Sequence, residues 1–357
     1  MKKLKEVNFK DQKVLIRCDF NVPIEEGIIE EDERIVSALE TINFILDQDP
    51  AWVLLISHLG KPKGQIKESL SLQPIKKRLE ELLDKKVELV RSLEALIALK
   101  EKKEKGELQK LYLLENVRFW PEEEAGDRDW SEKICSGMDI FVNEAFSVSH
   151  REHSSVFIFP QLIKEKCPGF LFEKEKKVLT GLLRPEKRPA VAIIGGSKIE
   201  TKLPTIQFLR ENYDAVLVGG KVANEALDKK MDLGEKVFWP VDFSPLDEQT
   251  SRLDIGEKTV ALFREKISSA KTLIWNGPLG MFEREEYSLG TQAIISALEE
   301  NRLAYKVVGG GETIEALKKF ASLADFDYIS MSGGAMLEFL SGKELPGIKA
   351  LEEKNLV

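Results

Sequence analysis

The sequence predicts an α/β protein that contains parallel sheets and is divided into two domains. Short apolar runs without polar interruption, such as residues 190–194, are typical of strands that are covered on both faces. Segments with helical periodicity lie between such runs, as they do in α/β folds. The 357 residues exceed one typical domain and suit two, each large enough for its own core.

The composition narrows the classes of function. The formal net charge of −8 argues against a general nucleic-acid binder, so cationic sites must be local. No apolar run reaches the roughly 18 residues that a membrane span needs, and no signal-peptide core follows the amino terminus. The three cysteines are far apart and form no C-x-x-C pair, which indicates reduced thiols. We therefore expect a cytoplasmic protein that binds neither nucleic acid nor membrane.

The amino-terminal half contains five predicted strands, which span residues 14–20, 52–56, 87–90, 111–114 and 139–144. A second helix is predicted over residues 71–83, after an amphipathic helix that begins at Arg34. The apolar stripe of that first helix is Ile35, Leu39, Ile42 and Ile45. Residues 100–110 are mostly lysine and glutamate, which indicates a solvated surface segment.

Polar side chains follow four of these strands. They are Asp19 and Asn21 after the first strand, His58 and Lys61 after the second, Arg118 after the fourth and Arg151 after the fifth. The amide, imidazole, ammonium and guanidinium donors in this set suit a small anionic substrate. A structural interpretation stays open, because Asp19 and Asn21 are also turn formers and an arginine such as Arg34 is normally a solvated helix residue.

His150 and His153 lie three residues apart, a spacing that allows both to ligate a metal. No third ligand cluster accompanies them in the sequence. We therefore favour the interpretation without a metal at these histidines.

Glycine turns follow five predicted strands in the carboxyl-terminal half. The turns contain Gly195-Gly196, Gly219-Gly220, Asn276-Gly277-Pro278-Leu279-Gly280, Gly309-Gly310-Gly311 and Gly333-Gly334. One such turn is usually a plain connection, but in an open parallel sheet all five lie at the carboxyl edge, where ligands bind. Exposed backbone at such an edge suits a chain of phosphates.

Lys198 and Lys202 follow the first of these turns at a spacing of four. On a helix this spacing places both ammonium groups on one face, beside the unpaired N–H groups of the helix start, which predicts an anion site. The chain has no G-x-x-x-x-G-K-[ST] loop and no convincing dinucleotide motif, so a nucleotide site would be of another kind. The first half thus offers side chains that suit a small anionic substrate, and the second offers backbone and lysines that suit phosphates. This contrast suits the transfer of a phosphoryl group between the two halves.

Six motifs of the chain resemble those of the phosphoglycerate kinase family, in the family's order. They are Arg17-Cys18-Asp19-Phe20-Asn21-Val22-Pro23, Ser57-His58-Leu59-Gly60, Leu114-Glu115-Asn116-Val117-Arg118-Phe119, Trp275-Asn276-Gly277-Pro278, Gly309-Gly310-Gly311 and Gly342-Lys343-Glu344-Leu345-Pro346-Gly347. The resemblance covers the chain nearly end to end. It implies two Rossmann-like domains, a substrate domain over residues 1–169 with the tail 343–357 packed on it, and a nucleotide-binding domain over residues 185–342. A hinge helix at residues 170–184 would join them.

The resemblance also implies the reaction, in which 1,3-bisphosphoglycerate and ADP give 3-phosphoglycerate and ATP with Mg²⁺. We expect a monomer whose partners are these small molecules. Asp19 and Asn21 would bind the glycerate body, and Arg34 would hold its carboxylate and stabilise the transferring phosphoryl group. The distal phosphate would be held by His58, Lys61, Arg118 and Arg151.

In the second domain, the resemblance assigns Lys198 to the moving phosphoryl group and Lys202 to the nucleotide phosphates. Pro278 would lie beside the adenine and Glu283 on the ribose hydroxyls. The other nucleotide contacts would come from Gly196, Gly220, Asn276, Gly309, Gly310, Gly311, Glu312 and Thr313. Among these, Gly310 and Gly311 would also act in catalysis, and Glu312 would hold the magnesium.

Several residues depart from the family's usual pattern. Lys61 stands in place of an arginine and loses a bidentate phosphate contact. Lys221 replaces a glycine near the expected adenine, Glu312 replaces an aspartate at the metal, and Ser332 precedes two glycines instead of three. These changes bear on rate and nucleotide preference. They make a catalytically silent nucleotide-binding paralogue the alternative hypothesis.

Overall fold

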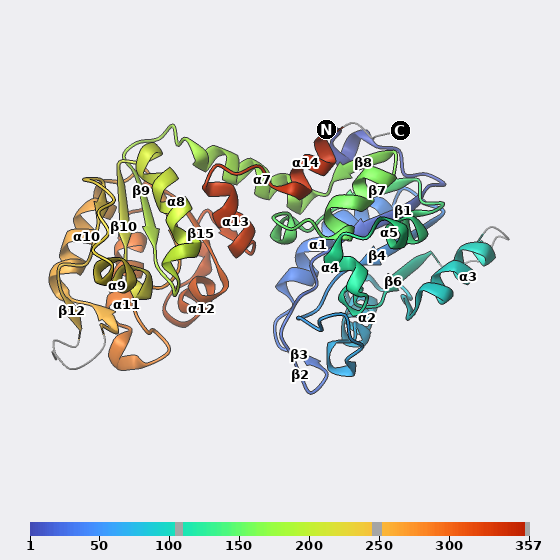
Figure 1. The fold of residues 1–357 in the computed structure, drawn as a ribbon, viewed down its shortest axis with the longest axis horizontal. Coiled ribbons are helices and arrows are strands. Elements are labelled where there is room, and N and C mark those ends of the chain that lie inside the picture. Colours follow the sequence, from blue (N-terminus) through green and yellow to red (C-terminus); the bar gives the residue numbers. More distant parts are fainter. Residues whose placement is uncertain (104–109, 245–251, 354–357) are drawn as a thin grey trace. The chain divides into compact units, whose positions relative to one another are not determined.

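The computed structural model describes residues 1–103, 110–244 and 252–353 (Figure 1). The chain groups into two compact units. Unit 1 holds Met1–Lys176 together with the tail from Glu344, and unit 2 holds Lys177–Lys343. The boundary between the units lies within helix α7, Phe170–Leu183.

Unit 1 is built on a six-stranded parallel sheet with the order β5-β6-β4-β1-β7-β8. Its strands are β1 Lys13–Arg17, β4 Trp52–Ile56, β5 Glu88–Val90, β6 Leu111–Leu114, β7 Ile140–Asn143 and β8 Glu165–Pro168. The five predicted strands are confirmed. The sixth, β8, was not predicted, because it is an edge strand whose Glu165 and Lys166 interrupt the apolar pattern.

The helices of unit 1 surround this sheet. They are α1 Glu33–Leu46, α2 Gln73–Leu83, α3 Leu93–Lys103, α4 Pro121–Ala125, α5 Arg128–Cys135, α6 Phe159–Leu162 and α14 Pro346–Glu352. Single turns of helix are η1 Leu4–Glu6, η2 Glu68–Leu70, η3 Val117–Phe119, η4 Phe146–Val148 and the π-type η5 Ser154–Ile158, and β2 Ile24–Glu25 pairs with β3 Ile28–Ile29. The predicted stripe of α1 is confirmed, since Ile35, Ile42 and Ile45 are buried in the core and Leu39 packs against it.

The prediction of a solvated segment over residues 100–110 is wrong at Lys100, which is half-buried. Its ammonium donates to the carbonyls of Lys133, Ile134 and Ser136 at the end of α5, at 2.8–3.0 Å. Burial there lowers the pKa of Lys100 to about 8. Residues 104–109, on which most of that prediction falls, lie outside the described part of the chain.

Unit 2 is built on a second six-stranded parallel sheet, with the order β11-β10-β9-β14-β15-β16. Its strands are β9 Ala190–Ile194, β10 Ala215–Val218, β11 Val237–Phe238, β14 Thr272–Asn276, β15 Tyr305–Gly309 and β16 Tyr328–Ser330, and β12 Phe243–Ser244 pairs with β13 Asp254–Ile255. The five strands that precede glycine turns are confirmed. The two-residue strand β11 is too short to produce a sequence pattern.

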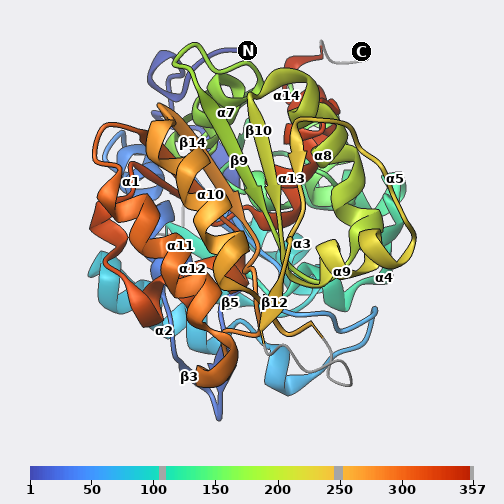
Figure 2. The ribbon, with the colours of Figure 1, turned by 90° about the vertical axis from the view of Figure 1, so that its left-hand side faces the viewer.

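Helices cover both faces of this second sheet. They are α8 Ile199–Asn212, α9 Gly220–Asp228, α10 Glu257–Ser269, α11 Leu289–Glu300, α12 Gly311–Phe320 and α13 Gly333–Leu340, with single turns at η6 Glu285–Tyr287 and η7 Leu323–Asp325. Val191 and Ile193 of β9 share a core with Phe263 of α10 and Ile294 of α11. In Figure 2, α8 lies on the other side of the strands from α10. The predicted α/β class with parallel sheets is therefore confirmed.

Two further expectations concern cysteines and membranes. Cys18, Cys135 and Cys167 are buried free thiols. Among the described residues, no helix combines the length and the apolar character needed to cross a bilayer.

Candidate functional site

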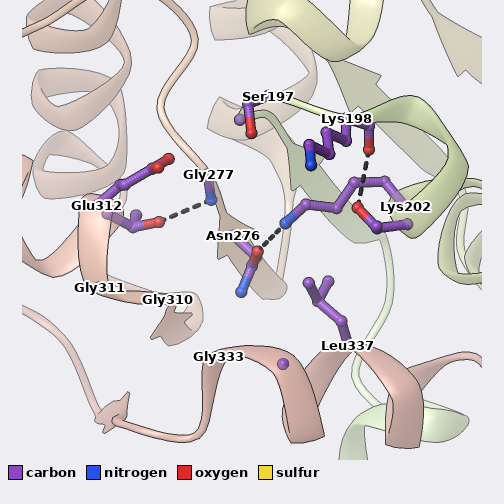
Figure 3. A pocket seen from close by; sticks show the side chains of 14 residues that line it. Ser197, Lys198, Lys202, Asn276, Gly277, Gly310, Gly311, Glu312, Gly333 and Leu337 are labelled. Atoms are coloured by element: carbon purple, nitrogen blue, oxygen red, sulfur yellow. Dashed lines mark hydrogen bonds between the residues drawn. The ribbon is translucent and has the colours of Figure 1, made fainter. Parts of the chain in front are cut away.

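A pocket of about 430 Å³ lies at the carboxyl edge of the unit 2 sheet (Figure 3). Its walls come from the turns after β9, β14 and β15 and from the starts of α8, α12 and α13. The lining residues are Gly196, Ser197, Lys198, Thr201, Lys202, Asn276, Gly277, Gly310, Gly311, Glu312, Thr313, Gly333, Gly334 and Leu337. All five glycine turns therefore follow parallel strands at this edge, and four of them line the pocket; Gly219 and Gly220 do not line it.

The glycines of this edge have two different uses. A Cβ at Gly195 would lie 2.1 Å from the carbonyl oxygen of Pro278, and one at Gly277 would lie 2.3 Å from that of Gly195. Gly277 also has a φ of +96°, which L side chains rarely adopt. These two glycines let neighbouring turns pack against each other, and the Gly196 N–H donates to Pro278 at 3.0 Å. A Cβ at Gly311, in contrast, would meet no neighbouring atom within 4 Å and would point into open space.

Lys202 is a buried cation in the wall of this pocket. Its ammonium donates to the side-chain oxygen of Asn276 (Figure 3). Burial lowers the pKa of Lys202 to about 8, and the charge of Glu312 opposes this shift. A bound phosphate would oppose it further, so the pocket favours an anion beside this residue.

Lys198 lines the same pocket, but it does not lie on the face of the helix as predicted. It is the N-cap of α8, with an extended backbone at φ −132°, and its side chain is exposed. The two lysines therefore do not share a helical face. They converge because Lys198 ends the glycine turn and Lys202 lies on the first turn of the helix.

Glu312 is the acidic residue among those that line the pocket. It is exposed on the first turn of α12, one residue from Thr313, whose hydroxyl accepts a hydrogen bond from the Gly277 N–H at 2.7 Å. Magnesium commonly takes one or two protein carboxylates together with substrate phosphates, and a single carboxylate beside an anion pocket fits that pattern. No group of three or more metal-ligating side chains occurs among the described residues.

Four residues expected to contact nucleotide, Gly220, Pro278, Glu283 and Gly309, are not among the lining residues of this pocket. Gly309 ends β15, where a Cβ would lie 2.2 Å from the sulfur of Met336. Gly220 starts α9, where a Cβ would lie 2.8 Å from the Pro278 carbonyl oxygen, so both belong to the packed turns. Glu283 is exposed, and Lys319 donates to its carbonyl at 3.3 Å.

The pocket also contains residues that the sequence argument did not assign. They are Ser197, Thr201, Gly277, Gly333, Gly334 and Leu337. Gly277, Gly333 and Gly334 belong to the glycine turns that the sequence predicts at this edge, so the sequence does carry a signal for them. Leu337 lies on α13 one turn beyond Gly333, and the sequence carries no signal that distinguishes it from core leucines.

A second constellation lies at the carboxyl edge of the unit 1 sheet. The carboxylate of Asp19 is buried, and it accepts from the guanidinium of Arg34 and, at 2.5 Å, from the hydroxyl of Ser147. Burial alone would raise the pKa of Asp19, but the charge of Arg34 and the hydrogen bond from Ser147 outweigh it and lower this pKa overall. Asp19 also accepts from the Asn21 N–H at 3.2 Å, so both the turn and the ion pair are present.

His58 and Arg118 are buried beside this ion pair. Nδ1 of His58 lies 3.9 Å from Oδ1 of Asp19. Arg118 donates to the Gly60 carbonyl at 2.8 Å, and its Nε lies 3.4 Å from Glu124. Burial lowers the pKa of Arg118 to about 10, a value at which it still carries its charge near neutral pH. The cluster is therefore a compact concentration of donors.

Asn21, Lys61 and Arg151 extend this cluster to the surface, where all three are exposed. The side-chain oxygen of Asn21 accepts from the Gly60 N–H at 2.8 Å, which ties the first loop to the second. The charge of Arg151 lies close enough to contribute to the lowered pKa of Arg118. Exposure leaves the cations of Lys61 and Arg151 accessible to an anion.

His153 belongs to no group of three or more metal-ligating side chains in the described part of the chain. It packs beside buried Glu123, with Nδ1 3.9 Å from the carboxylate. Burial lowers the pKa of His153 to about 3, and the neighbouring charges of Arg118 and Arg151 add to the shift. It is a neutral part of the wall behind the cluster.

Comparison with known proteins identifies the family. The family model described as phosphoglycerate kinase matches residues 4–242 and 229–343. A phosphoglycerate kinase from Geobacter metallireducens is 39% identical, with 97% of each chain covered, and one from Finegoldia magna is 35% identical, with 99% of each covered. The solved structure of phosphoglycerate kinase from Coxiella burnetii matches with a TM-score of 0.84 at 34% identity over 98% of each chain. That from Pyrococcus horikoshii OT3 matches with a TM-score of 0.83 at 31% identity over 99% of this chain and 98% of the other. The chain therefore belongs to the phosphoglycerate kinase family.

Proposed function

We propose that the protein catalyses the reversible reaction of 1,3-bisphosphoglycerate with ADP to give 3-phosphoglycerate and ATP. The family makes it a phosphotransferase with a carboxyl group as acceptor. The observation that carries the proposal is the glycine-lined pocket of unit 2, in which Lys198, Lys202 and Glu312 converge. That set of backbone, cations and one carboxylate suits a magnesium-bound chain of phosphates.

The cluster of unit 1 would hold the glycerate substrate. Asp19 and Asn21 would accept from and donate to the glycerate body, and Arg34, fixed by its ion pair with Asp19, would meet the carboxylate. The distal phosphate would lie among His58, Lys61, Arg118 and Arg151. The buried members of this set are already oriented by Gly60, Asp19 and Glu124, so little ordering is needed on binding.

The pocket of unit 2 would hold the nucleotide phosphates. Lys202 and Asn276 would bind them from the wall, and the accessible backbone of Gly310 and Gly311 would face them. Gly196, Gly309 and Thr313 would complete the phosphate end, while Gly220, Pro278 and Glu283 would lie toward the nucleoside. Glu312 would hold Mg²⁺, which when bound neutralises phosphate charge.

The chemistry that these residues must perform is modest. The carboxylate of 3-phosphoglycerate is already a nucleophile, so no general base is needed, and the transferring group mainly requires positioning and charge neutralisation. Lys198, exposed at the mouth of the pocket, and Arg34, part-buried at the other cluster, would supply the charges that meet the moving phosphoryl group.

Arg34→Ala and Lys198→Ala test this assignment in a coupled assay with 3-phosphoglycerate and MgATP. Each should lower kcat by about 10³-fold or more, as expected for a cation that stabilises the transition state. Lys229→Arg, which changes an exposed lysine paired with Glu200, is the control. Turnover of Lys198→Ala within tenfold of the parent would reject its role. Tight nucleotide binding by the parent without any turnover would instead support the silent paralogue.

We also propose that the enzyme acts as a monomer in the cytoplasm on these small molecules alone. The net charge of −8 supports this, because it disfavours binding to nucleic acid or anionic membranes. Sedimentation equilibrium at micromolar concentration should give the mass of one chain, 40.4 kDa.

A further inference from the structure

Arg17 is a buried arginine that the roles proposed above leave unused. It ends β1, and only 1% of its surface is exposed. Nε donates to the hydroxyl of Ser155 at 2.8 Å, and Nη1 donates to the carbonyl of Cys18. Nη2 lies 3.2 Å from Nδ1 of His58. Three nitrogens with three partners fix the plane of the guanidinium.

The contact with His58 determines where that imidazole holds its proton. A guanidinium has only donors, so Nδ1 of His58 must accept this hydrogen bond through its lone pair. A proton on Nδ1 would need an acceptor of its own, and the nearest carboxylate oxygen, on Asp19, is 3.9 Å away, beyond hydrogen-bond distance. The proton of a neutral imidazole must then be on Nε2.

The surroundings of His58 keep this imidazole neutral. Burial lowers the pKa of His58 well below its usual range. The charge of Asp19 opposes this shift, and those of Arg17, Arg118 and Arg34 add to it. An imidazolium would therefore be a fourth cation beside three arginines, and Asp19 is the carboxylate whose charge favours it.

Arg17 is itself held from behind by a buried carboxylate. The hydroxyl of Ser155, on η5, accepts from Arg17 and donates to Glu123 at 2.6 Å. The Ser155 N–H donates to the other oxygen of Glu123 at 2.9 Å, and Glu123, on α4, is fully buried. The guanidinium thus takes its position from elements far apart in the sequence, which is the arrangement expected of a group that orients another.

We propose that Arg17 is a positioning residue that holds His58 as a neutral imidazole with its proton on Nε2. His58 then offers one oriented N–H donor and no charge, and the phosphate is neutralised by arginines and lysine. The use of this donor rests on the proposed function, in which His58 meets the distal phosphate. The state of the imidazole itself does not, because it is set in the substrate-free protein.

Nitrogen-15 NMR of histidine-labelled protein tests the inference directly. The chain contains only three histidines, His58, His150 and His153, and loss of one signal set in His58→Gln assigns His58. The substrate-free parent should show His58 in the Nε2–H form, unchanged between about pH 5.5 and 8, the range in which an unperturbed histidine titrates. An imidazolium or an Nδ1–H form within that range overturns the proposal, whether or not the enzyme is active.

Arg17→Lys tests the part played by the arginine. A single ammonium cannot serve Ser155, Cys18 and His58 together, so the Nδ1–H form or a titration should emerge in the same NMR experiment. The KM for 3-phosphoglycerate should rise about tenfold, as for loss of an oriented hydrogen bond to a charged group, while the KM for MgATP stays within about twofold. Arg128→Lys, at an exposed arginine paired with Glu132, is the matched control.

An unchanged His58 spectrum in Arg17→Lys would show that the arginine does not set the tautomer. If that variant does not fold, Ser155→Ala removes the acceptor of Arg17 Nε, and its His58 spectrum is read in the same way. If the parent is active but His58 is not in the Nε2–H form, this inference is wrong and the proposed function stands. If His58 is in the Nε2–H form but the parent is inactive, the proposed function is wrong and this inference stands.

Discussion

Lys202 is a buried ammonium whose described partner is an amide oxygen, that of Asn276. Because no carboxylate of the described residues is hydrogen-bonded to it, burial prevails over the opposing charge of Glu312 and the pKa of Lys202 falls to about 8. The residue is therefore charged at neutral pH but loses its charge within about two pH units above it. Its affinity for phosphate must depend on pH in that range.

We predict that kcat/KM for MgATP falls as the pH rises through about 8, the pKa of Lys202 in the free enzyme. The sign follows from charge, since the ammonium present below this pKa attracts phosphate and the amine above it does not. Lys202→Arg keeps its charge and should remove the fall. Initial rates from about pH 7 to 9.5 at constant ionic strength measure it. An identical fall in Lys202→Arg would assign the titration to another group.

At the scale of elements, the turns after β9 and β14 form a single packed unit. Gly195 and Gly277 have backbone atoms of the opposing turn within 2.3 Å of where a Cβ would lie. Gly311, at the start of α12, has no such neighbour. Replacement of glycine by alanine should therefore lower stability at Gly195 and weaken ligand binding at Gly311.

Gly195→Ala should destabilise the protein by about 2 kcal/mol or more, because backbone atoms must move to admit the methyl group. Gly311→Ala should change stability by less than about 0.5 kcal/mol but weaken MgADP binding, since its methyl enters the space proposed for phosphate. Urea unfolding and titration calorimetry separate the two effects. Equal stability of both variants would contradict the packing argument.

The first turn of α7 is tied to two other elements through Glu144, which follows β7. Oε1 of Glu144 accepts from the hydroxyl of Thr41 on α1 at 2.7 Å and from the Leu171 N–H at 3.2 Å. The Phe170 N–H donates to the same hydroxyl at 2.9 Å. Burial raises the pKa of Glu144 to about 8, against the opposing effect of these hydrogen bonds.

We predict that this carboxyl makes stability fall as the pH rises. Its pKa is about 8 in the folded state against an ordinary value of 4.5, so between these values the folded state holds the extra proton, and the stabilisation is lost as the pH passes about 8. Glu144→Gln should flatten the dependence of the urea midpoint between about pH 5 and 8.5 and be the more stable protein at the upper end. Exposed Glu101→Gln is the control. A parent midpoint that does not change with pH would refute the assignment.

At the scale of the whole molecule, the proposed reaction needs groups from both units. The cluster with Arg34 belongs to unit 1 and the pocket with Lys198 to unit 2. We therefore predict that 3-phosphoglycerate and MgADP together reduce the radius of gyration in small-angle X-ray scattering, whereas either alone reduces it less. No reduction with both ligands would count against closure during the reaction.

The sequence by itself determined the α/β class, ten strands and the edge at which the glycine turns meet. Apolar runs such as Ala190–Ile194 and the glycines that end them are local patterns, so they can be recognised without knowing which residues contact them in the fold. Six family motifs likewise placed Asp19, Arg118 and Asn276 among the candidate residues. Edge strand β8 was missed because its pattern is half polar.

Only the tertiary structure decided how those residues are used. It showed that Gly195 serves packing, that Lys198 lies before α8 rather than on its face, and that Lys100 caps α5. It also showed that Arg17 is buried against His58, which lies 41 positions away in the chain. Burial, hydrogen-bond partners and pKa depend on atoms that are distant in sequence and near in space, and no local pattern carries that information.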